Sequence, residues 1–216
     1  MDYSQLTSLR SICSKLFHLF LLTFFHHTNS ISATFLSTTN TPFDFIRSSC
    51  NTTLYPEVCY TSLSHYANAV NLDPAQLARI AIGVTLVHAR QAATSFSNMT
   101  RWADYGPDPR AMSAIHDCSS TFVDAVDQMR GSLKQMSHLA TDVGSSVEAV
   151  RFQLGNVQTW MSAALTNEDT CSDGFKDVAE CAVKAQVCGM VVNVKQFTSN
   201  ALALVNSYAD SVTSRK

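Results

Sequence analysis

Residues 187–208 read VCGMVVNVKQFTSNALALVNSY, and their apolar side chains recur at steps of three and four. This spacing puts them on one face of an α-helix, because a helix turns once every 3.6 residues. The recurring positions are Val187, Met190, Val191, Val194, Phe197, Ala201, Leu204, Val205 and Tyr208. Such a stripe is stable only when other elements cover it. The segment therefore predicts a helix that packs against further helices.

Three segments upstream show the same periodicity. Their apolar positions are Leu77, Ile80, Ala81, Val84 and Val87; Met112, Ile115, Phe122, Val126, Met129, Leu133 and Met136; and Val147, Val150, Leu154, Val157, Trp160 and Ala164. No proline follows Pro109 and the chain has only seven glycines, so little interrupts a helix. We expect four helices, near residues 74–101, 109–138, 145–166 and 172–210.

Each expected helix has a start signal. The first two signals are a carboxylate N-cap followed by proline, and the last two are a capping box and a near variant of one. In chain order they are Asp73-Pro74, Asp108-Pro109, Ser145 with Glu148, and Thr170 with Asp173. Short connections make consecutive helices antiparallel neighbours. The sequence thus predicts an all-α, up-down-up-down four-helix bundle over 73–210, preceded by a short helical hairpin over 42–70.

The first 33 residues differ from the rest of the chain. Arg10 and Lys15 precede an apolar run over 16–25, and small residues follow at Ser30, Ser32 and Ala33. A basic start, a short apolar run and a small-residue exit are typical of a secretory signal peptide, so we expect residues 1–33 to be removed. A membrane anchor or a buried helix is the alternative, but the run is about half the length needed to span a bilayer. The mature form is expected to be free of the membrane.

Secretion changes the interpretation of the seven cysteines. Cys13 would leave with the signal peptide, and an even number in an oxidising compartment indicates disulfides. A bridge between Cys50 and Cys59 would hold the hairpin, and one between Cys118 and Cys171 would tie the second helix to the fourth. Spacing alone does not choose among the fifteen possible pairings. The sequons at Asn51 and Asn98 also fit secretion, and both are candidate glycosylation sites.

The remaining two cysteines, Cys181 and Cys188, lie seven positions apart. On one continuous helix their Cα atoms would be about 10.5 Å apart, beyond the reach of a disulfide. They either stay as thiols, pair through an interruption near 179–189, or bond to another chain.

Charge and motifs exclude several functions. The formal net charge is −2 and no run of Lys and Arg occurs, so neither nucleic acid nor an anionic membrane is an expected partner. The chain has no nucleophile elbow, zinc-protease helix, phosphate-binding glycine loop or C-x-x-C pair. We therefore expect no cofactor, no metal and no catalytic residues, and interpret the chain as a binding protein rather than an enzyme.

Four spaced motifs point to a known family. They are SCNTTLYPEVC over 49–59, Asp117-Cys118 with Phe122 and Asp124-Ala125, NVQTWMSAALT over 156–166 running to TCSDGF over 170–175, and Asn193-Val194 leading to SNALAL over 199–204. In this order the chain resembles the plant invertase and pectin methylesterase inhibitors over residues 44–208. The resemblance implies a four-helix bundle with a helical hairpin before it. It also implies the disulfides Cys50–Cys59 and Cys118–Cys171, whereas Cys181 and Cys188 depart from the usual pattern.

The resemblance also implies a function. Invertase inhibitors of the family are associated with a Pro-Lys-Phe tripeptide, which this chain lacks, and residues 156–175 are closer to the pectin methylesterase branch. The expected function is a secreted inhibitor in the apoplast that occludes the esterase's substrate cleft in a one-to-one complex. The second, third and fourth helices would cover the cleft, with Asp124, Asp127, Thr170 and Asp173 at the interface. The alternatives are an invertase inhibitor on the same scaffold and a non-inhibitory structural or signalling partner.

Overall fold

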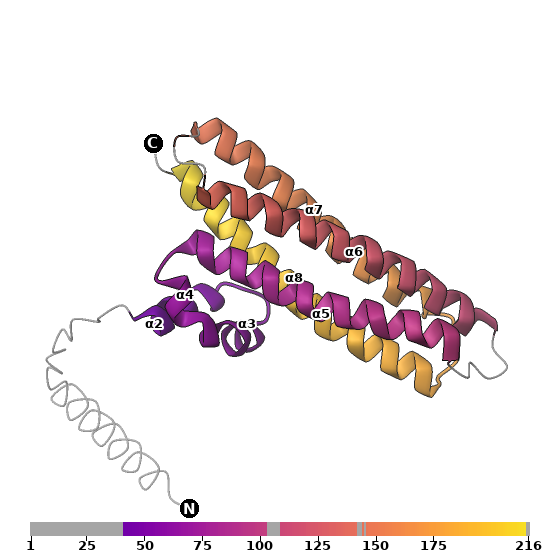
Figure 1. Cartoon of the computed structure of the whole chain (residues 1–216). Helices are drawn as coiled ribbons and strands as arrows, with labels where there is room; N and C mark the ends of the chain where they lie inside the picture. The colour runs from indigo at the N-terminus through magenta and orange to yellow at the C-terminus, as the bar shows by residue number, and fades with distance from the viewer. Residues whose placement is uncertain (1–40, 103–108, 142–143, 145, 215–216) are drawn as a thin grey trace, which may run out of the picture. The chain divides into compact units, whose positions relative to one another are not determined.

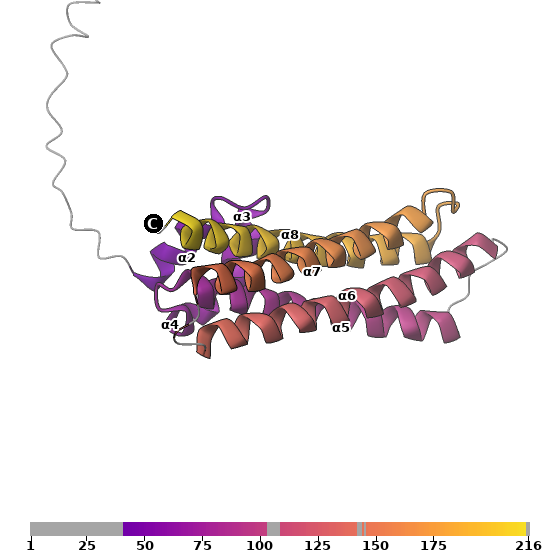
Figure 2. The same ribbon diagram turned by 90° about the horizontal axis from the view of Figure 1, so that it is seen from above.

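The computed structural model of the chain describes residues 41–102, 109–141, 144 and 146–214, which belong to one compact unit (Figure 1). Four long helices make up most of it. They are α5 (Pro74–Trp102), α6 (Pro109–Thr141), α7 (Val147–Gly174) and α8 (Ala182–Ser214). Figure 2 shows them lying side by side along their lengths. Helix α6 packs against α5 and α7, and α8 closes the bundle by packing against the same two helices.

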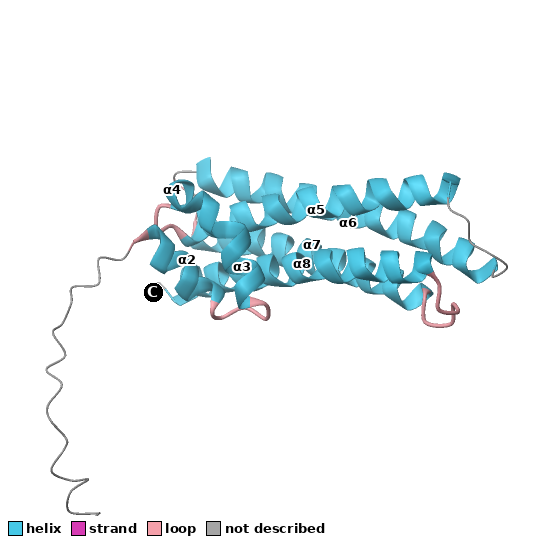
Figure 3. Cartoon of the chain, turned by 90° about the horizontal axis from the view of Figure 1, so that it is seen from below, coloured by secondary structure: helices cyan, strands magenta, loops and turns pink. Residues whose placement is uncertain are grey.

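The fold class is confirmed, with helices and no strand among the described residues (Figure 3). Two helix boundaries are corrected. The third helix continues to Gly174 and the fourth begins at Ala182, whereas the sequence predicted a boundary between 166 and 172. Thr170 therefore does not cap a helix: its hydroxyl lies inside α7 and donates to the carbonyl of Thr166 at 2.9 Å.

The observed N-caps explain where the helices begin. An Asp73 carboxylate oxygen accepts from the Ala75 amide at 2.9 Å ahead of α5. Ser146, not Ser145, caps α7, because its hydroxyl accepts from the Ala149 amide at 3.2 Å. Ser145 and Asp108 lie outside the described residues, as does the expected signal peptide. Each cap satisfies an amide that has no partner within the helix.

The core is formed by the inner faces of the four helices. Phe96 of α5 and Phe122 of α6 meet edge to face, with ring centroids 4.8 Å apart, and both are fully buried. Most of the predicted apolar positions line this core, but Val87, Met112 and Val147 are exposed. Trp160 was also expected in the core, and the structure buries Met161 there instead.

A helical hairpin packs at one end of the bundle, ahead of α5. It comprises α2 (Pro42–Cys50), α3 (Pro56–Leu63), the 3-10 turn η1 (Ser64–Tyr66) and α4 (Ala67–Val70). A disulfide joins Cys50 to Cys59 across the α2–α3 turn, with their Cα atoms 5.5 Å apart. The hairpin is too short to bury a sizeable core by itself, so it needs anchors to the bundle.

Asn200 of α8 supplies such an anchor. Its side-chain oxygen accepts from the Tyr55 amide at 3.0 Å, and its side-chain nitrogen donates to the Tyr55 carbonyl at 2.9 Å. Asn200 is buried, and both ends of its amide group are satisfied by one backbone position of the hairpin. A buried amide paired in this way fixes orientation as well as position.

Replacing Asn200 with alanine should leave the Tyr55 amide and carbonyl without these partners and lower the free energy of unfolding by about 1–3 kcal/mol. Chemical denaturation followed by circular dichroism measures the change. Asn206→Ala is the matched control, since Asn206 is exposed on the same helix and bonds only to Gln158 among the described residues. Equal effects of the two substitutions would contradict an anchoring role for Asn200.

Candidate partner-binding site

The candidate site lies on the α6–α7 pair, and two cross-links hold that pair in register. A disulfide joins Cys118 to Cys171 with a Cα–Cα distance of 4.4 Å. About three turns further along α6, the Asn167 side-chain nitrogen donates to the Gln128 side-chain oxygen at 3.1 Å. The disulfide therefore connects the second bundle helix to the third, not to the fourth as the sequence analysis proposed. Its partner Cys171 lies near the end of α7 because α7 is longer than expected.

A close approach between α6 and α7 accounts for Trp160. A Cβ atom added to Gly131 would lie 3.4 Å from atom Cε3 of the Trp160 ring. The ring therefore covers the glycine at the seam between the helices instead of pointing into the core. A side chain as small as a methyl group at this position would be in ordinary van der Waals contact with the ring.

Asp124 and Asp127 are both exposed on α6, within the stretch bounded by the two cross-links. Asp127 forms an ion pair with Arg130 one turn ahead on the same helix. It also lines a hollow on the α5 side of α6 together with Arg90 of α5. Among the described residues, Asp124 has neither an ion pair nor a side-chain hydrogen bond. It is thus the carboxylate most available to an outside cation.

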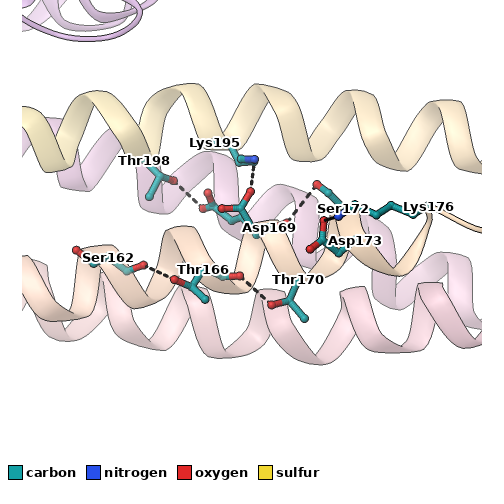
Figure 4. Close-up of polar contacts among 10 residues, drawn as sticks. Ser162, Thr166, Asp169, Thr170, Ser172, Asp173, Lys176, Lys195 and Thr198 are labelled. Atoms are coloured by element: carbon teal, nitrogen blue, oxygen red, sulfur yellow. Dashed lines mark hydrogen bonds and ion pairs between the residues drawn. The ribbon is translucent and has the colours of Figure 1, made fainter.

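Thr170 and Asp173 are exposed on the outer face of α7 (Figure 4). Asp173 pairs with Lys176 of the following turn at 2.8 Å, and this carboxylate raises the pKa of the Lys176 ammonium. The hydroxyl of Thr170 donates to the Thr166 carbonyl, and the hydroxyl of Thr166 donates to the Ser162 carbonyl at 3.0 Å. The outer face of α7 thus carries short hydroxyl side chains followed by acidic groups.

The structure brings these four residues to one stretch of the α6–α7 pair without direct contact between them. Among the described residues, no hydrogen bond or ion pair joins the two aspartates of α6 to Thr170 or Asp173. They form a surface rather than a catalytic cluster. In the described part of the chain, no group of three or more His, Cys, Asp or Glu side chains is arranged to hold a metal.

Sequence analysis missed a buried acid on α7, where this helix contacts α8. Glu168 of α7 is fully buried, and its Oε1 lies 2.6 Å from the Thr198 hydroxyl of α8. The same hydroxyl lies 3.1 Å from the Val194 carbonyl. One hydroxyl hydrogen cannot serve two acceptors fully. Both contacts are satisfied when Glu168 carries a proton and donates it to Thr198, which then donates to Val194.

The second carboxyl oxygen of Glu168 supports the same protonation state. It is buried and has no hydrogen-bond partner, which would be costly for an ionised carboxylate. Burial raises the pKa of Glu168 from 4.5 to about 8, opposed by the Thr198 hydrogen bond and the charge of Lys195. Lys195 forms an ion pair with Asp169, and Asp169 adds a smaller upward effect on the pKa.

A signal for Glu168 was present in the sequence. Leu154, Val157, Met161, Ala164, Glu168 and Cys171 follow one another at steps of three and four, and all are buried. A search for apolar residues ends this stripe at Ala164, because glutamate usually lies in solvent. Extending the period through Glu168 to Cys171 would have predicted both the buried acid and the full length of α7.

The two remaining thiols and the sequons lie outside this surface. Cys181 is exposed just before α8, and its sulfur accepts from the Lys184 amide at 3.5 Å, so it occupies the helix cap. Cys188 is half-buried within α8, and neither is in a disulfide. Asn51 is exposed in the turn after α2, and Asn98 is exposed in α5. None of the described helices has the length and apolar character needed to cross a bilayer.

Burial of Glu168 predicts that stability falls as pH rises. The folded chain binds this proton more tightly than the unfolded chain, so the stabilisation is complete below about pH 4.5 and is lost as pH rises toward 8. Within that window the free energy of unfolding should decrease by roughly 1.4 kcal/mol per pH unit relative to Glu168→Gln. Urea denaturation of both proteins across the window measures the difference. The control is Glu148→Gln, at an exposed position of α7, for which the free energy of unfolding should depend on pH as it does in the wild type. If the free energies of unfolding of wild type and Glu168→Gln depended on pH equally, Glu168 would not hold a buried proton.

The chain is similar to known proteins. Residues 44–204 match the family described as plant invertase/pectin methylesterase inhibitor. The chain is 40% identical over 166 residues to the 21 kDa protein of Daucus carota, covering 76% of this chain and 83% of that protein. It is 39% identical over 180 residues to Pectinesterase inhibitor 10 of Arabidopsis thaliana, covering 83% of this chain but only 55% of that relative's length.

A solved structure supports the fold. A crystal structure of a mutant form of a pectin methylesterase inhibitor from Arabidopsis superposes with a TM-score of 0.56 at 21% identity. The match covers 73% of this chain and 92% of that chain. At this identity the likeness bears on the fold alone. On the sequence matches, the chain belongs to the plant invertase/pectin methylesterase inhibitor family.

Proposed function

We propose that the chain inhibits a pectin methylesterase by covering its substrate cleft with the outer faces of α6, α7 and α8, without performing chemistry itself. The observation that carries the proposal is the sequence similarity to relatives named pectinesterase inhibitors, at 36–39% identity over about three quarters or more of the chain. The rigid and exposed α6–α7 surface supports it, because its backbone is held in register by the Cys118–Cys171 bridge and needs little reordering on binding.

The four interface residues would contribute unequally. Asp127 and Asp173 already have a cation on their own helix, in Arg130 and Lys176. A cation from the esterase would have to compete with these exposed pairs, which are weak. Asp124 has no such competitor among the described residues, so a partner's Lys or Arg gains most there. Thr170 would contribute close packing, since its hydroxyl is already engaged with the Thr166 carbonyl.

The site of action in this proposal is the plant cell wall. Removal of residues 1–33 would release the mature chain into the secretory route, where the Cys50–Cys59 and Cys118–Cys171 bridges are stable. The exposed Asn51 and Asn98 are proposed as glycosylation sites on the same route. The wall is mildly acidic, and in that range Glu168 would stay protonated in the folded chain, so the α7–α8 contact would be more stable than at neutral pH.

Titration of a purified pectin methylesterase and a purified invertase with the mature chain tests the target. We expect stoichiometric loss of esterase activity and unchanged invertase activity. Analytical ultracentrifugation of the mixture should show a one-to-one complex with the esterase. Inhibition of invertase alone would assign the chain to the other target class, and inhibition of neither would leave a non-inhibitory partner role.

Charge reversal tests the acidic face. Asp124→Lys combined with Asp127→Lys should weaken esterase inhibition by roughly tenfold or more, because cations would then face cations across the interface. Asp124→Lys alone should account for most of the loss. The matched control for Asp124→Lys is Glu57→Lys, because Glu57 is an exposed carboxylate on α3, outside the proposed contact. Circular dichroism verifies the fold of each variant, and unchanged potency of the double variant would exclude both aspartates from the interface.

A further inference from the structure

Helix α5 differs from the other bundle helices in charge. Its 29 residues include Arg79, Arg90 and Arg101 and no aspartate or glutamate. By contrast, α6 balances its basic residues with Asp117, Asp124 and Asp127, and the C-terminal half of α7 is acidic. The chain as a whole carries a formal charge of −2, so this helix concentrates positive charge on an otherwise slightly acidic protein.

The three arginines lie on one stripe of α5. Each follows the previous one by eleven residues, which is close to three helical turns and places successive residues about 16.5 Å apart along the axis. Arg90 and Arg101 are exposed and Arg79 is half-buried. In the described structure none of the three guanidinium groups is in an ion pair, and Arg79 donates to the neutral side chain of Gln76 at 2.9 Å.

The stripe follows the seam between α5 and α6, which lie side by side in Figures 1 and 2. Two shallow hollows, each of about 230 Å³, open along this seam. One is lined by Arg90 together with Arg130 and Asp127 of α6, which form an ion pair with each other. The other is lined by Arg79 with Leu133 of α6. Gly83 lines the hollow beside Arg79 and Thr94 lines the one beside Arg90, and neither residue carries a bulky side chain.

We propose that this arginine stripe, Arg79, Arg90 and Arg101 on α5, binds a linear polyuronate, namely stretches of pectin that have lost their methyl esters. A polymer that carries one carboxylate per sugar can lie along α5 and contact the three arginines one after another. Guanidinium groups bind carboxylates through paired hydrogen bonds, and several such contacts along one chain reinforce each other. The α5–α6 hollows would accept sugar rings between the arginines.

The choice of polyuronate rests on the proposed function, because de-esterified pectin is the product of the enzyme that the chain would inhibit. The stripe lies mainly on α5, whereas the proposed enzyme contact uses α6, α7 and α8. Bound polymer would lie on α5 and bound enzyme on α6, α7 and α8, and the two would be adjacent at the hollow that Asp127 shares with Arg90. The inhibitor would be retained where de-esterification has already occurred, and would act on esterase molecules nearby.

Affinity electrophoresis of the mature chain in gels that contain polygalacturonate tests the proposal. We expect retardation at low salt that weakens as salt is raised, and little retardation in gels that contain highly methyl-esterified pectin. The triple variant Arg79→Gln, Arg90→Gln and Arg101→Gln should bind polygalacturonate about tenfold or more weakly. Arg130 is left unchanged, since it pairs with Asp127 of the proposed esterase contact.

A second triple variant controls for net charge. Arg47→Gln, Arg151→Gln and Lys184→Gln removes three positive charges from α2, α7 and α8 and should retain most of the binding. Equal loss in both triple variants, equal retardation by esterified pectin, or no retardation of the wild type would each overturn the proposal. Esterase inhibition is measured on the same proteins: the α5 variant should inhibit normally. If the wild type binds polygalacturonate but does not inhibit the esterase, only the proposed function is refuted. If it inhibits the esterase but does not bind polygalacturonate, only this inference is refuted.

Discussion

The register of α6 against α7 is the constraint on which the partner surface depends. A covalent bridge at Cys118–Cys171 and an amide pair at Gln128–Asn167 join the two helices at two points, and the Trp160 ring packs over Gly131 between them. The covalent bridge prevents one helix from sliding along the other, and the amide pair and core packing restrict rotation. The exposed groups between them are therefore held in one arrangement before any partner arrives. A third contact, Glu168 with Thr198, extends the same restraint to α8.

Charge divides the bundle into two unlike faces. The acidic groups Asp124, Asp169 and Asp173 lie on α6 and α7, whereas α5 carries arginines alone. Asp169 and Asp173 are each paired with a lysine, whereas Asp124 and the three arginines of α5 have no ion-pair partner among the described residues. These unpaired groups therefore set the local charge of each helix. One small bundle can thus present surfaces of opposite sign.

The fold could be predicted from sequence because apolar periodicity reports directly which face of a helix is covered. The boundary between the third and fourth helices could not, since Thr170 and Asp173 have the spacing of a capping box although both lie within α7. Residue type alone does not distinguish a hydroxyl that caps an amide from one that bonds to a carbonyl four residues back. Glu168 was missed for a related reason: its burial depends on a proton and on Thr198, and neither can be read from a count of apolar residues.

The candidate surface was located by motif resemblance, whereas the role of each of its members depends on neighbours in space. The ion pairs that distinguish Asp127 and Asp173 from Asp124 are of the i, i+3 type and accessible to sequence reasoning. The hollow that Asp127 shares with Arg90 of α5 cannot be predicted from sequence, because it is formed only when the two helices pack together.

The ladder of Ser162, Thr166 and Thr170 on α7 has a consequence for association. The hydroxyls of Thr166 and Thr170 already donate to carbonyls one turn back, so a molecule that settles on them displaces little tightly held water. These side chains are also short, so immobilising them on binding loses little conformational entropy. A partner can therefore cover this polar surface at a small entropic cost. The cost would be larger if the surface carried long charged side chains such as lysine or glutamate.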